Sequence, residues 1–423
     1  MPRLLFMVLL PLLCGAALSA ELPAAIPPVP ADGLDVDEAV ATALKWNPDL
    51  RALRKQSAIA EGEIVTAGAL HNPSLKIELL HAQEASQMGW SGTLSFIPPQ
   101  PVELSARRGQ ASARLDEVRS AIAEREWGLI NQVRLSHATL IELREQKRLY
   151  EESVAVRQRL ISIIRTRVER GATTRLELNL AEIAGLQMRR ALDELELRRV
   201  QGQAQLQGLM GLVSAEPIQV RGERASDVDL AAEPDAAALF ASALGQRPLL
   251  KAAHARIRQR EQALRLEKTR RWPWFELNTS YRHNNSTKYP NDLQLGVELN
   301  LPVLNLNSGP IQVAHAELDR EQAQLEAQVI SVEQSIRAAC AELRVRREIL
   351  VRFQREVLPI ISEHERLMEV AVRGLQVDLV ALLGSEESAL RARREESDAR
   401  LAYQRAWLAL ESAAGAPLRE VVR

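Results

Sequence analysis

The chain has 423 residues, and its 54 Lys and Arg against 55 Asp and Glu give a formal net charge of −1. This balance excludes the strongly basic surface that steers proteins to nucleic acid, and it gives no overall field toward an anionic membrane. Aromatic residues make up only 4% of the chain, whereas helix formers are abundant. This composition predicts long helices rather than a compact core rich in aromatic side chains.

The N-terminus has the pattern of a secretory signal peptide. A short basic start ending at Arg3 precedes an apolar run over 4–18, and small residues over 17–20 offer a cleavage site. We therefore expect residues 1–20 to be removed and residues 21–33 to form a linker to the folded part. No later run reaches about 18 apolar residues, the length that a membrane-spanning helix needs, so no such helix is predicted.

The chain contains an internal two-fold repeat. Residues 247–254 (RPLLKAAH) echo residues 47–54 (NPDLRALR), and residues 371–381 (AVRGLQVDLVA) echo residues 168–178 (VERGATTRLEL). Matching segments lie 200 to 203 residues apart, a spacing that indicates tandem duplication of one unit rather than a solenoid. We assign the parts as repeat 1 over 34–215, a linker over 216–234, repeat 2 over 235–415 and a tail over 416–423.

Each repeat is predicted to begin with two short helices. In repeat 1, Asp35 and Glu38 have the spacing of a capping box that opens the first helix. The pair Asn47 and Pro48 predicts the cap and the first residue of the second helix.

A very long helix is predicted later in repeat 1, because no proline occurs between Val102 and Glu216. From about residue 105 to 170 it would be about 100 Å long at about 1.5 Å per residue. Since a helix of this kind must bury its seam on a neighbour, we expect a reversal at Gly171 and a return helix. Repeat 2 is expected to do the same, with a reversal at Gly374 and a kink at Pro359. The seam has a heptad-like spacing and comprises Leu129, Val133, Leu140, Leu143, Tyr150, Val154, Ile161, Ile164 and Val168.

Two β-hairpins are predicted, over about 73–98 and about 273–302, because apolar and polar residues alternate there with a period of two. The apolar positions are expected to share one face and are Leu75, Ile77, Leu94, Phe96, Phe275, Leu277, Leu295, Val297 and Leu299. The polar positions are expected to share the other face and are Lys76, Glu78, Thr93, Ser95, Glu276, Asn278, Gln294, Glu298 and Asn300.

Strand length and aromatic placement favour a membrane barrel. The stretch 292–301 is about 33 Å long at about 3.3 Å per residue, and it rises about 25 Å when tilted as in outer-membrane barrels. Trp90, Trp272 and Trp274 begin strands, as girdle residues do. The apolar positions would then face lipid and the polar positions a water-filled lumen. Four strands cannot close a barrel, so other copies must complete it, in a number that these residues do not fix. The alternative is a soluble sheet whose apolar face packs on helices.

Several features together resemble the TolC-type outer-membrane efflux proteins: the segment at 34–50 (LDVDEAVATALKWNPDL), the paired hairpins, the paired glycine reversals and the two-fold repeat. The junctions at 100–111 (QPVELSARRGQA) and 301–317 (LPVLNLNSGPIQVAHAE) are similar to the heavy-metal (cobalt–zinc–cadmium) branch. The resemblance implies a mainly α protein whose long antiparallel coiled-coil helices form a periplasmic α-barrel. Each copy would give four strands to one twelve-stranded barrel of a homotrimer in the outer membrane of a Gram-negative cell.

The implied function is the passive exit duct of a tripartite efflux system. The duct would receive divalent heavy-metal cations from a periplasmic adaptor (membrane fusion) protein and an inner-membrane pump of the RND type. One alternative is a duct for organic toxicants or drugs. Another is a soluble periplasmic coiled-coil adaptor or scaffold.

The two reversals are the implied docking surface for the adaptor: Arg170, Gly171, Ala172, Thr173, Thr174, Arg175, Arg373, Gly374, Leu375 and Gln376. In such proteins acidic residues just beyond the tip glycines often ring a constriction, which makes Glu177 and Asp378 the candidates. The repeat counterpart of Glu177 is Val380, and Asp378 stands two residues earlier. The alternative role of both carboxylates is to complement the macrodipole at a helix N-terminus.

No catalytic, cofactor or metal site is predicted. The seven histidines are scattered, and the sequence has neither a His-x-x-x-His pair nor a Cys-x-x-Cys motif. Adjacent glutamates such as Glu386 and Glu387 are interpreted as solvated helix faces. A secreted enzyme is a further alternative, but no residue is nominated for it, and a passive duct leaves the choice of metal to the inner-membrane partner.

Overall fold

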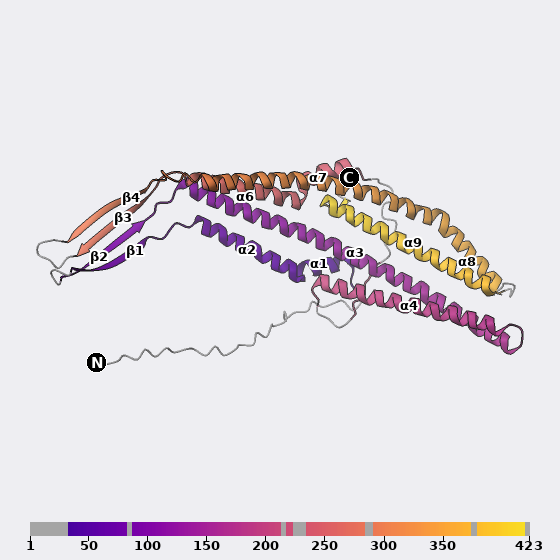
Figure 1. Cartoon of the computed structure of the whole chain (residues 1–423). Helices are drawn as coiled ribbons and strands as arrows, with labels where there is room; N and C mark the ends of the chain where they lie inside the picture. Colours follow the sequence, from indigo (N-terminus) through magenta and orange to yellow (C-terminus); the bar gives the residue numbers. More distant parts are fainter. Residues whose placement is uncertain are drawn as a thin grey trace, which may run out of the picture.

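The computed structural model describes residues 33–82, 87–212, 217–222, 234–283, 291–373 and 379–418. The predicted signal segment lies outside the described residues. The molecule is elongated: its helices run side by side along one long axis, its strands extend from one end, and its helical hairpins turn at the other (Figure 1). Among the described helices, none is both long enough and apolar enough to cross a membrane.

Both repeats follow the same order of elements. Repeat 1 comprises α1 (Val36–Trp46), α2 (Pro48–Gly68), β1 (Ser74–Ala82), β2 (Gln87–Phe96), α3 (Pro101–Glu169) and α4 (Arg175–Met210). Repeat 2 comprises α5 (Ala236–Gln246), α6 (Pro248–Thr269), β3 (Trp274–His283), β4 (Asp292–Asn300), α7 (Ser308–Arg352), the π-helix η1 (Phe353–Val357), α8 (Leu358–Arg373) and α9 (Leu379–Ala414). The predicted two-fold repeat is confirmed in three dimensions.

The predicted starts of the first two helices are confirmed. The Glu38 carboxylate accepts from the Asp35 amide at 3.0 Å, which forms half of a capping box at α1. The Asn47 side-chain oxygen accepts from the Leu50 amide at 2.9 Å, and Pro48 is the first residue of α2.

The long helix α3 has 69 residues and packs along α2, α4 and α6. The predicted seam is buried or half-buried along its whole length. In repeat 2 the outgoing helix is interrupted by η1, which ends two residues before Pro359. Proline lacks the amide that would pair with the carbonyl four residues earlier, so the α-helical hydrogen-bond ladder is interrupted just before Pro359, the residue where a kink is predicted.

The hydrophobic core is duplicated residue by residue. In repeat 1 the buried set includes Ala39, Ala43, Leu50, Leu129, Val133, Leu140 and Leu206. In repeat 2 the equivalent positions are Leu239, Ala243, Leu250, Val332, Ile336, Leu343 and Leu410. Each core therefore joins the two helices that open the repeat to both arms of its long helical hairpin.

A polar clamp also repeats at the base of each hairpin. Asn47 donates its side-chain N–H to the carbonyl of Leu209, near the end of α4, at 2.9 Å. Arg247 occupies the same place in repeat 2 and donates to the carbonyl of Ala413, near the end of α9, at 2.7 Å. Burial lowers the pKa of the Arg247 guanidinium, and Glu124 opposes that effect. Each clamp supplies a donor to a carbonyl that helix ends leave without an intrahelical partner.

Candidate channel wall and helical tips

The four strands form one antiparallel sheet in the order β1-β2-β3-β4. Directly opposed residues in a sheet point to the same side, so the register assigns every side chain to a face. On one face Leu75 lies opposite Leu94, Phe96 opposite Leu277, and Leu277 opposite Val297. The chain of pairs places all nine predicted apolar positions on this face, which we call the apolar face.

The apolar face is uncovered in the described molecule. Leu295 is 80% exposed, Val297 67% and Ile77 66%. The helices lie end to end with the sheet rather than against it, so no described helix packs on this face (Figure 1). The alternative of a soluble sheet lying on the helices therefore does not describe these residues.

The opposite face is polar and internally hydrogen-bonded, and it holds all nine predicted polar positions. Thr93 donates to the Ser280 hydroxyl at 3.2 Å, and Ser95 donates to the Asn278 side-chain oxygen at 2.5 Å. Lys76 forms an ion pair with Glu78 at 2.6 Å. This polar face has the character of a surface that meets water.

Both outer strands of the sheet are edges. Within the described residues, β1 pairs only with β2, and β4 pairs only with β3. Each edge strand is nine residues long and carries exposed apolar side chains such as Leu79 and Leu295. Natural proteins do not leave edges of this length and character open to water.

The tip between α3 and α4 is closed by a glycine in the left-handed conformation. Gly171 has φ +72° and follows the last helical turn of α3. The Ala172 amide donates to the Arg167 carbonyl at 2.8 Å, and the Gly171 amide donates to the Val168 carbonyl at 2.9 Å. These two bonds define a Schellman motif, and they explain why the reversal falls on this glycine.

Glu177 is placed at the start of α4, where its carboxylate accepts from the Thr173 hydroxyl. The Thr174 hydroxyl accepts from the Glu177 amide at 3.3 Å and caps the helix. In the single chain the carboxylate thus turns back onto the tip threonines, as a helix N-terminus favours. In repeat 2 the tip candidates Gly374, Leu375, Gln376 and Asp378 lie outside the described residues, and Arg373 is the last residue of α8.

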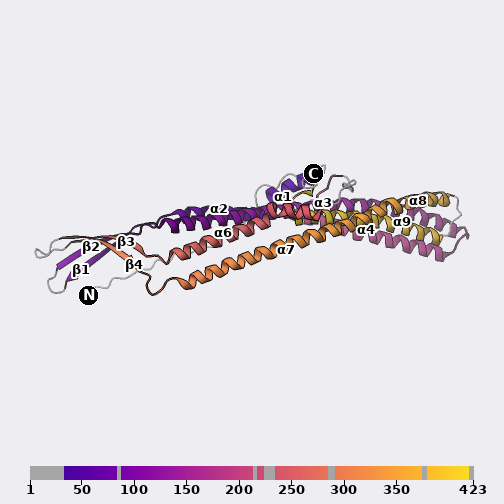
Figure 2. The same cartoon turned by 90° about the horizontal axis from the view of Figure 1, so that it is seen from above.

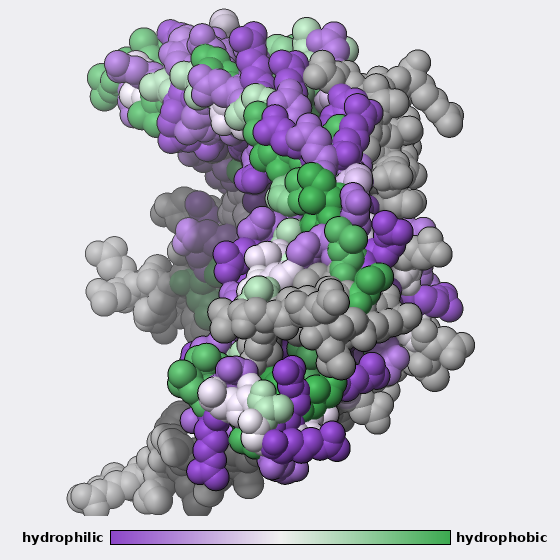
Figure 3. Space-filling model, turned by 90° about the vertical axis from the view of Figure 1, so that its right-hand side faces the viewer, coloured by the Kyte–Doolittle hydropathy of each residue, from purple (hydrophilic) through white to green (hydrophobic). Residues whose placement is uncertain are grey.

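Exposed apolar side chains follow the first turns of α4. Leu176 is 68% exposed, Leu180 42% and Ile183 52%. Their spacing of four and three residues places them on one side of the helix. Figure 3, which looks onto the tip end of the molecule, shows hydrophobic residues exposed among hydrophilic ones at this end.

Substitution of Gly171 by Ala is expected to destabilise the tip turn by about 1–2 kcal/mol, because a left-handed conformation disfavours a side chain. No steric clash adds to this cost, since a Cβ at this position meets nothing within 4 Å. Hydrogen exchange at the Ala172 amide would report the loss as faster exchange. The Gly171→Asn variant, which tolerates this conformation better, should recover most of the protection; equal protection in all three proteins would contradict the assignment.

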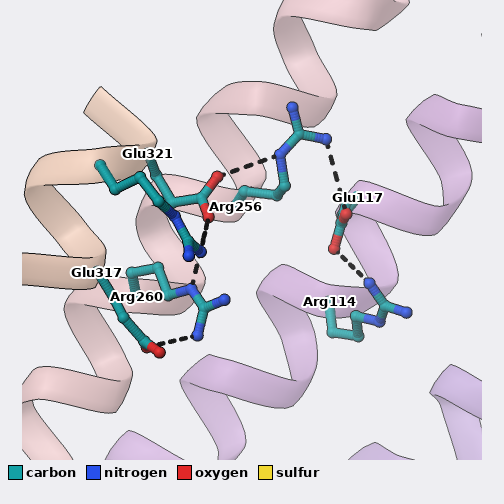
Figure 4. A network of polar contacts seen from close by, with 7 residues as sticks. Arg114, Glu117, Arg256, Arg260, Glu317 and Glu321 are labelled. Atoms are coloured by element: carbon teal, nitrogen blue, oxygen red, sulfur yellow. Dashed lines mark hydrogen bonds and ion pairs between the residues drawn. The ribbon is translucent and has the colours of Figure 1, made fainter. Parts of the chain in front are cut away.

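Carboxylates in the helical wall are paired with arginines. Figure 4 shows Arg256 of α6 between Glu117 of α3, at 3.7 Å, and Glu321 of α7, at 3.5 Å. Arg260 contacts Glu317 at 2.8 Å, and Arg114 contacts Glu117 at 2.6 Å. The network ties together α3, α6 and α7, which run side by side between the sheet and the tips (Figure 2).

A second set of polar contacts joins the two repeats. Ser397 of α9 donates to the buried Glu142 carboxylate of α3 at 2.7 Å. Gln146 donates to the Asp398 carboxylate at 3.0 Å. The contact fixes the α9 arm against α3, so the two helical hairpins stand side by side.

The expectation that Glu386 is solvated is wrong. Its carboxylate lies 3.9 Å from the guanidinium of Arg157, which is itself 5% exposed and donates to the Ala184 carbonyl. Burial raises the pKa of Glu386, and the nearby Arg157 opposes that effect. The side chain faces α3 and α4 because α9 packs there, a neighbour that local sequence does not reveal.

Comparison with known proteins identifies the family. The model of the outer membrane efflux protein family matches the chain twice, over residues 39–212 and 239–416. The chain belongs to this family. Each match covers one repeat, so the family model describes a single repeat unit and this chain contains two.

Individual relatives agree with this assignment. The chain is 22% identical to the cobalt-zinc-cadmium resistance protein CzcC of Cupriavidus metallidurans over 85% of both chains. Its fold matches crystal structures of CusC, with a TM-score of 0.75, 16% identity and coverage of 91% of this chain and 93% of the other. It also matches VceC of Vibrio cholerae, with a TM-score of 0.72, 16% identity and coverage of 90% and 96%.

Family membership decides between the broad alternatives. The protein is an outer-membrane efflux channel, and neither a soluble adaptor nor a secreted enzyme. Within the described residues, no group of three or more His, Cys, Asp or Glu side chains is placed to hold a metal ion. The features that sequence reasoning missed are the exposed side of α4, the arginine network and the buried partner of Glu386.

Proposed function

We propose that three copies of this chain form one outer-membrane duct, with residues 1–20 removed on export. The observation that carries the proposal is the sheet: one uncovered apolar face, one polar face and two open edges. In a closed barrel the apolar positions would face lipid, the polar positions would line a water-filled lumen, and the two edges would pair with neighbouring copies. In three copies the sheets give twelve strands, within the range of outer-membrane barrels.

The strand directions allow this closure. Consecutive strands alternate in direction, so β1 and β4 run antiparallel to one another. The β4 edge of one copy can therefore pair antiparallel with the β1 edge of the next, and a ring of identical copies repeats the same contact. The contact removes both edges and satisfies their backbone groups, which a lipid environment requires.

The helical tips are the proposed docking surface for a periplasmic adaptor. Most residues of the tip at 170–175 are exposed, and the uncovered side of α4 formed by Leu176, Leu180 and Ile183 offers apolar contact beside it. The tip of repeat 2, including Arg373 and the residues up to 376, would complete the surface. An inner-membrane pump of the RND type would bind the adaptor and supply the energy.

The proposed constriction lies just inside these tips and uses Glu177 and Asp378. In the isolated chain the Glu177 carboxylate accepts hydrogen bonds from the tip threonines and so stabilises the turn. In a closed ring, copies of the same carboxylate would approach each other around the axis. A ring of negative charge is a common device at cation pores.

The proposed cargo is divalent heavy-metal cations. The similarity to CzcC along most of both chains supports this choice. The duct itself needs no dedicated metal site, because a passive channel only has to provide a polar, water-filled path.

A deletion strain tests the cargo. Loss of the gene is expected to lower the tolerated concentration of cobalt, zinc or cadmium several-fold, with no change for a panel of organic toxicants. The wild-type gene on a plasmid should restore tolerance, and a copy lacking the tip residues 170–175 should not. Sensitivity to organic compounds alone would overturn the metal assignment and leave the duct itself standing.

A further inference from the structure

A cationic pocket lies where the helical wall joins the sheet. It has a volume of about 450 Å³ and is lined by Gln100, Pro101, Val102, Arg265, Lys268, Thr269 and Trp272. These residues come from the start of α3, the end of α6 and the turn that leads into β3. We call it the junction pocket. On the proposed function, this level is where strands leave the bilayer and helices enter the periplasm.

The junction pocket and a second pocket at the same level share Gln100 but are lined by different cations. The second pocket is lined by Arg107, Arg270 and Trp274. Trp274 lies opposite Asn300 and therefore on the polar face of the sheet. Arg270 is the residue after the last of α6 and keeps helical backbone angles, so it is turned about 140° from Arg265, five residues earlier, at 3.6 residues per turn. The junction pocket thus belongs to the side of the wall that continues the apolar face.

Its two cations are available for a ligand. Arg265 and Lys268 are exposed and make no ion pair with any described residue, whereas Arg270 is held by Glu267 at 2.7 Å. Among the described residues, no acidic side chain lines the pocket. The lining of the junction pocket therefore carries two positive charges and no negative one.

Apolar side chains flank these cations. Trp272 is 71% exposed and Val102 47%. A tryptophan beside cations at the edge of an apolar band is the arrangement expected at a membrane interface, where the ring sits among head groups and the cations meet phosphate. An anionic soluble ligand would not require the exposed apolar surface.

We propose that the junction pocket binds the head group of an anionic phospholipid of the inner leaflet of the outer membrane. The phosphate would lie between Arg265 and Lys268, and the upper part of the acyl chains would lie against Trp272 and Val102. The inference rests on the proposed function, because it requires the sheet to lie in the bilayer. Three copies would carry three such sites around the barrel, which would fix its height in the membrane.

Lipid binding to the purified full-length protein in detergent micelles tests the proposal. Native mass spectrometry would measure retention of phosphatidylglycerol against phosphatidylcholine as each lipid is titrated. The wild type should prefer phosphatidylglycerol, and the R265Q/K268Q variant should lose about 25-fold in affinity for it, from about fivefold per cation near an anionic lipid surface.

The matched control is the R119Q/K251Q variant. Both residues line a separate pocket that is also lined by Asp116 and lies farther from the sheet, since Lys251 is about 21 Å along α6 from Arg265 at about 1.5 Å per residue. This variant removes the same charge and should bind phosphatidylglycerol as the wild type does. The charge-preserving R265K variant should retain most of the affinity.

Three outcomes would overturn the proposal: equal wild-type retention of the two lipids, equal losses in the two double variants, or displacement of phosphatidylglycerol by millimolar inorganic phosphate. The preference of the wild type for phosphatidylglycerol over phosphatidylcholine can refute the site without any variant, so the proposal remains testable even if R265Q/K268Q fails to fold. Channel conductance after reconstitution distinguishes a failure of the proposed lipid site from a failure of the proposed function. A conducting protein without lipid preference refutes only this site, whereas a protein that never inserts refutes the proposed function.

Discussion

Placing arginine at position 297 is expected to reduce the stability of the assembled barrel by about 2–4 kcal/mol, the cost of a cation at the bilayer midplane on the lipid face of a β-barrel. Val297 lies in the middle part of β4, opposite Leu277, and is 67% exposed in the single chain. The same exposure would make the substitution nearly neutral if the face met water. The measurement is the urea concentration at the midpoint of unfolding of the complex reconstituted in vesicles.

The control for this prediction is Gln294→Arg. Gln294 lies on the polar face, opposite Ser280, in the same strand. If that face lines a water-filled lumen, its substitution should cost less than about 1 kcal/mol, as surface changes usually do. Similar losses for both variants, or no loss for Val297→Arg, would contradict the assignment of the faces.

Replacing Gly211 by alanine is expected to lower the free energy of unfolding of repeat 1 by about 3 kcal/mol. Gly211 ends α4 with φ +70°, and a Cβ there would lie 2.5 Å from the Trp46 carbonyl oxygen. The left-handed conformation contributes about 1–2 kcal/mol and the forced displacement of backbone about 1–3 kcal/mol. The base of the hairpin, where Asn47 binds α4, would be pushed apart.

The control is Gly208→Ala, one turn earlier in α4. A Cβ at Gly208 meets nothing within 4 Å, and the residue is helical. Alanine should therefore stabilise the helix by about 0.5–1 kcal/mol. Denaturant unfolding followed by circular dichroism would compare the two variants. A loss at position 208 as large as at position 211 would show that the close packing on Trp46 is not the cause.

Much of the wall could be predicted from local pattern. The alternation in β4 fixes which residues share a face, and the register across the sheet confirms the sets that begin at Leu75 and Lys76. The capping residues Asp35 and Asn47 and the seam of α3 were also predictable, because each depends on residues within a few turns. The internal repeat strengthened these predictions, because equivalent sequence patterns occur in both halves of the chain.

The missed features depend on partners far away in the sequence. Glu386 is half-buried because Arg157 of another hairpin lies against it, and Glu321 meets Arg256 across helices. The apolar spacing of Leu176, Leu180 and Ile183 normally indicates a buried side of a helix. Only the fold shows that no described helix covers it.

On the proposed function, this chain is one third of a closed outer-membrane wall. Cysteine cross-linking in intact outer membranes tests this closure in the C340S background, since Cys14 lies in the segment removed on export and Cys340 is the other cysteine of the sequence. One cysteine replaces Lys76 on β1, and a second replaces Gln294, Gly296 or Glu298 on β4, so that the neighbour's register is sampled. If three copies close the wall, at least one pair should oxidise into a ladder that ends at three copies. Monomers in every pair, or a ladder that continues beyond three, would contradict it.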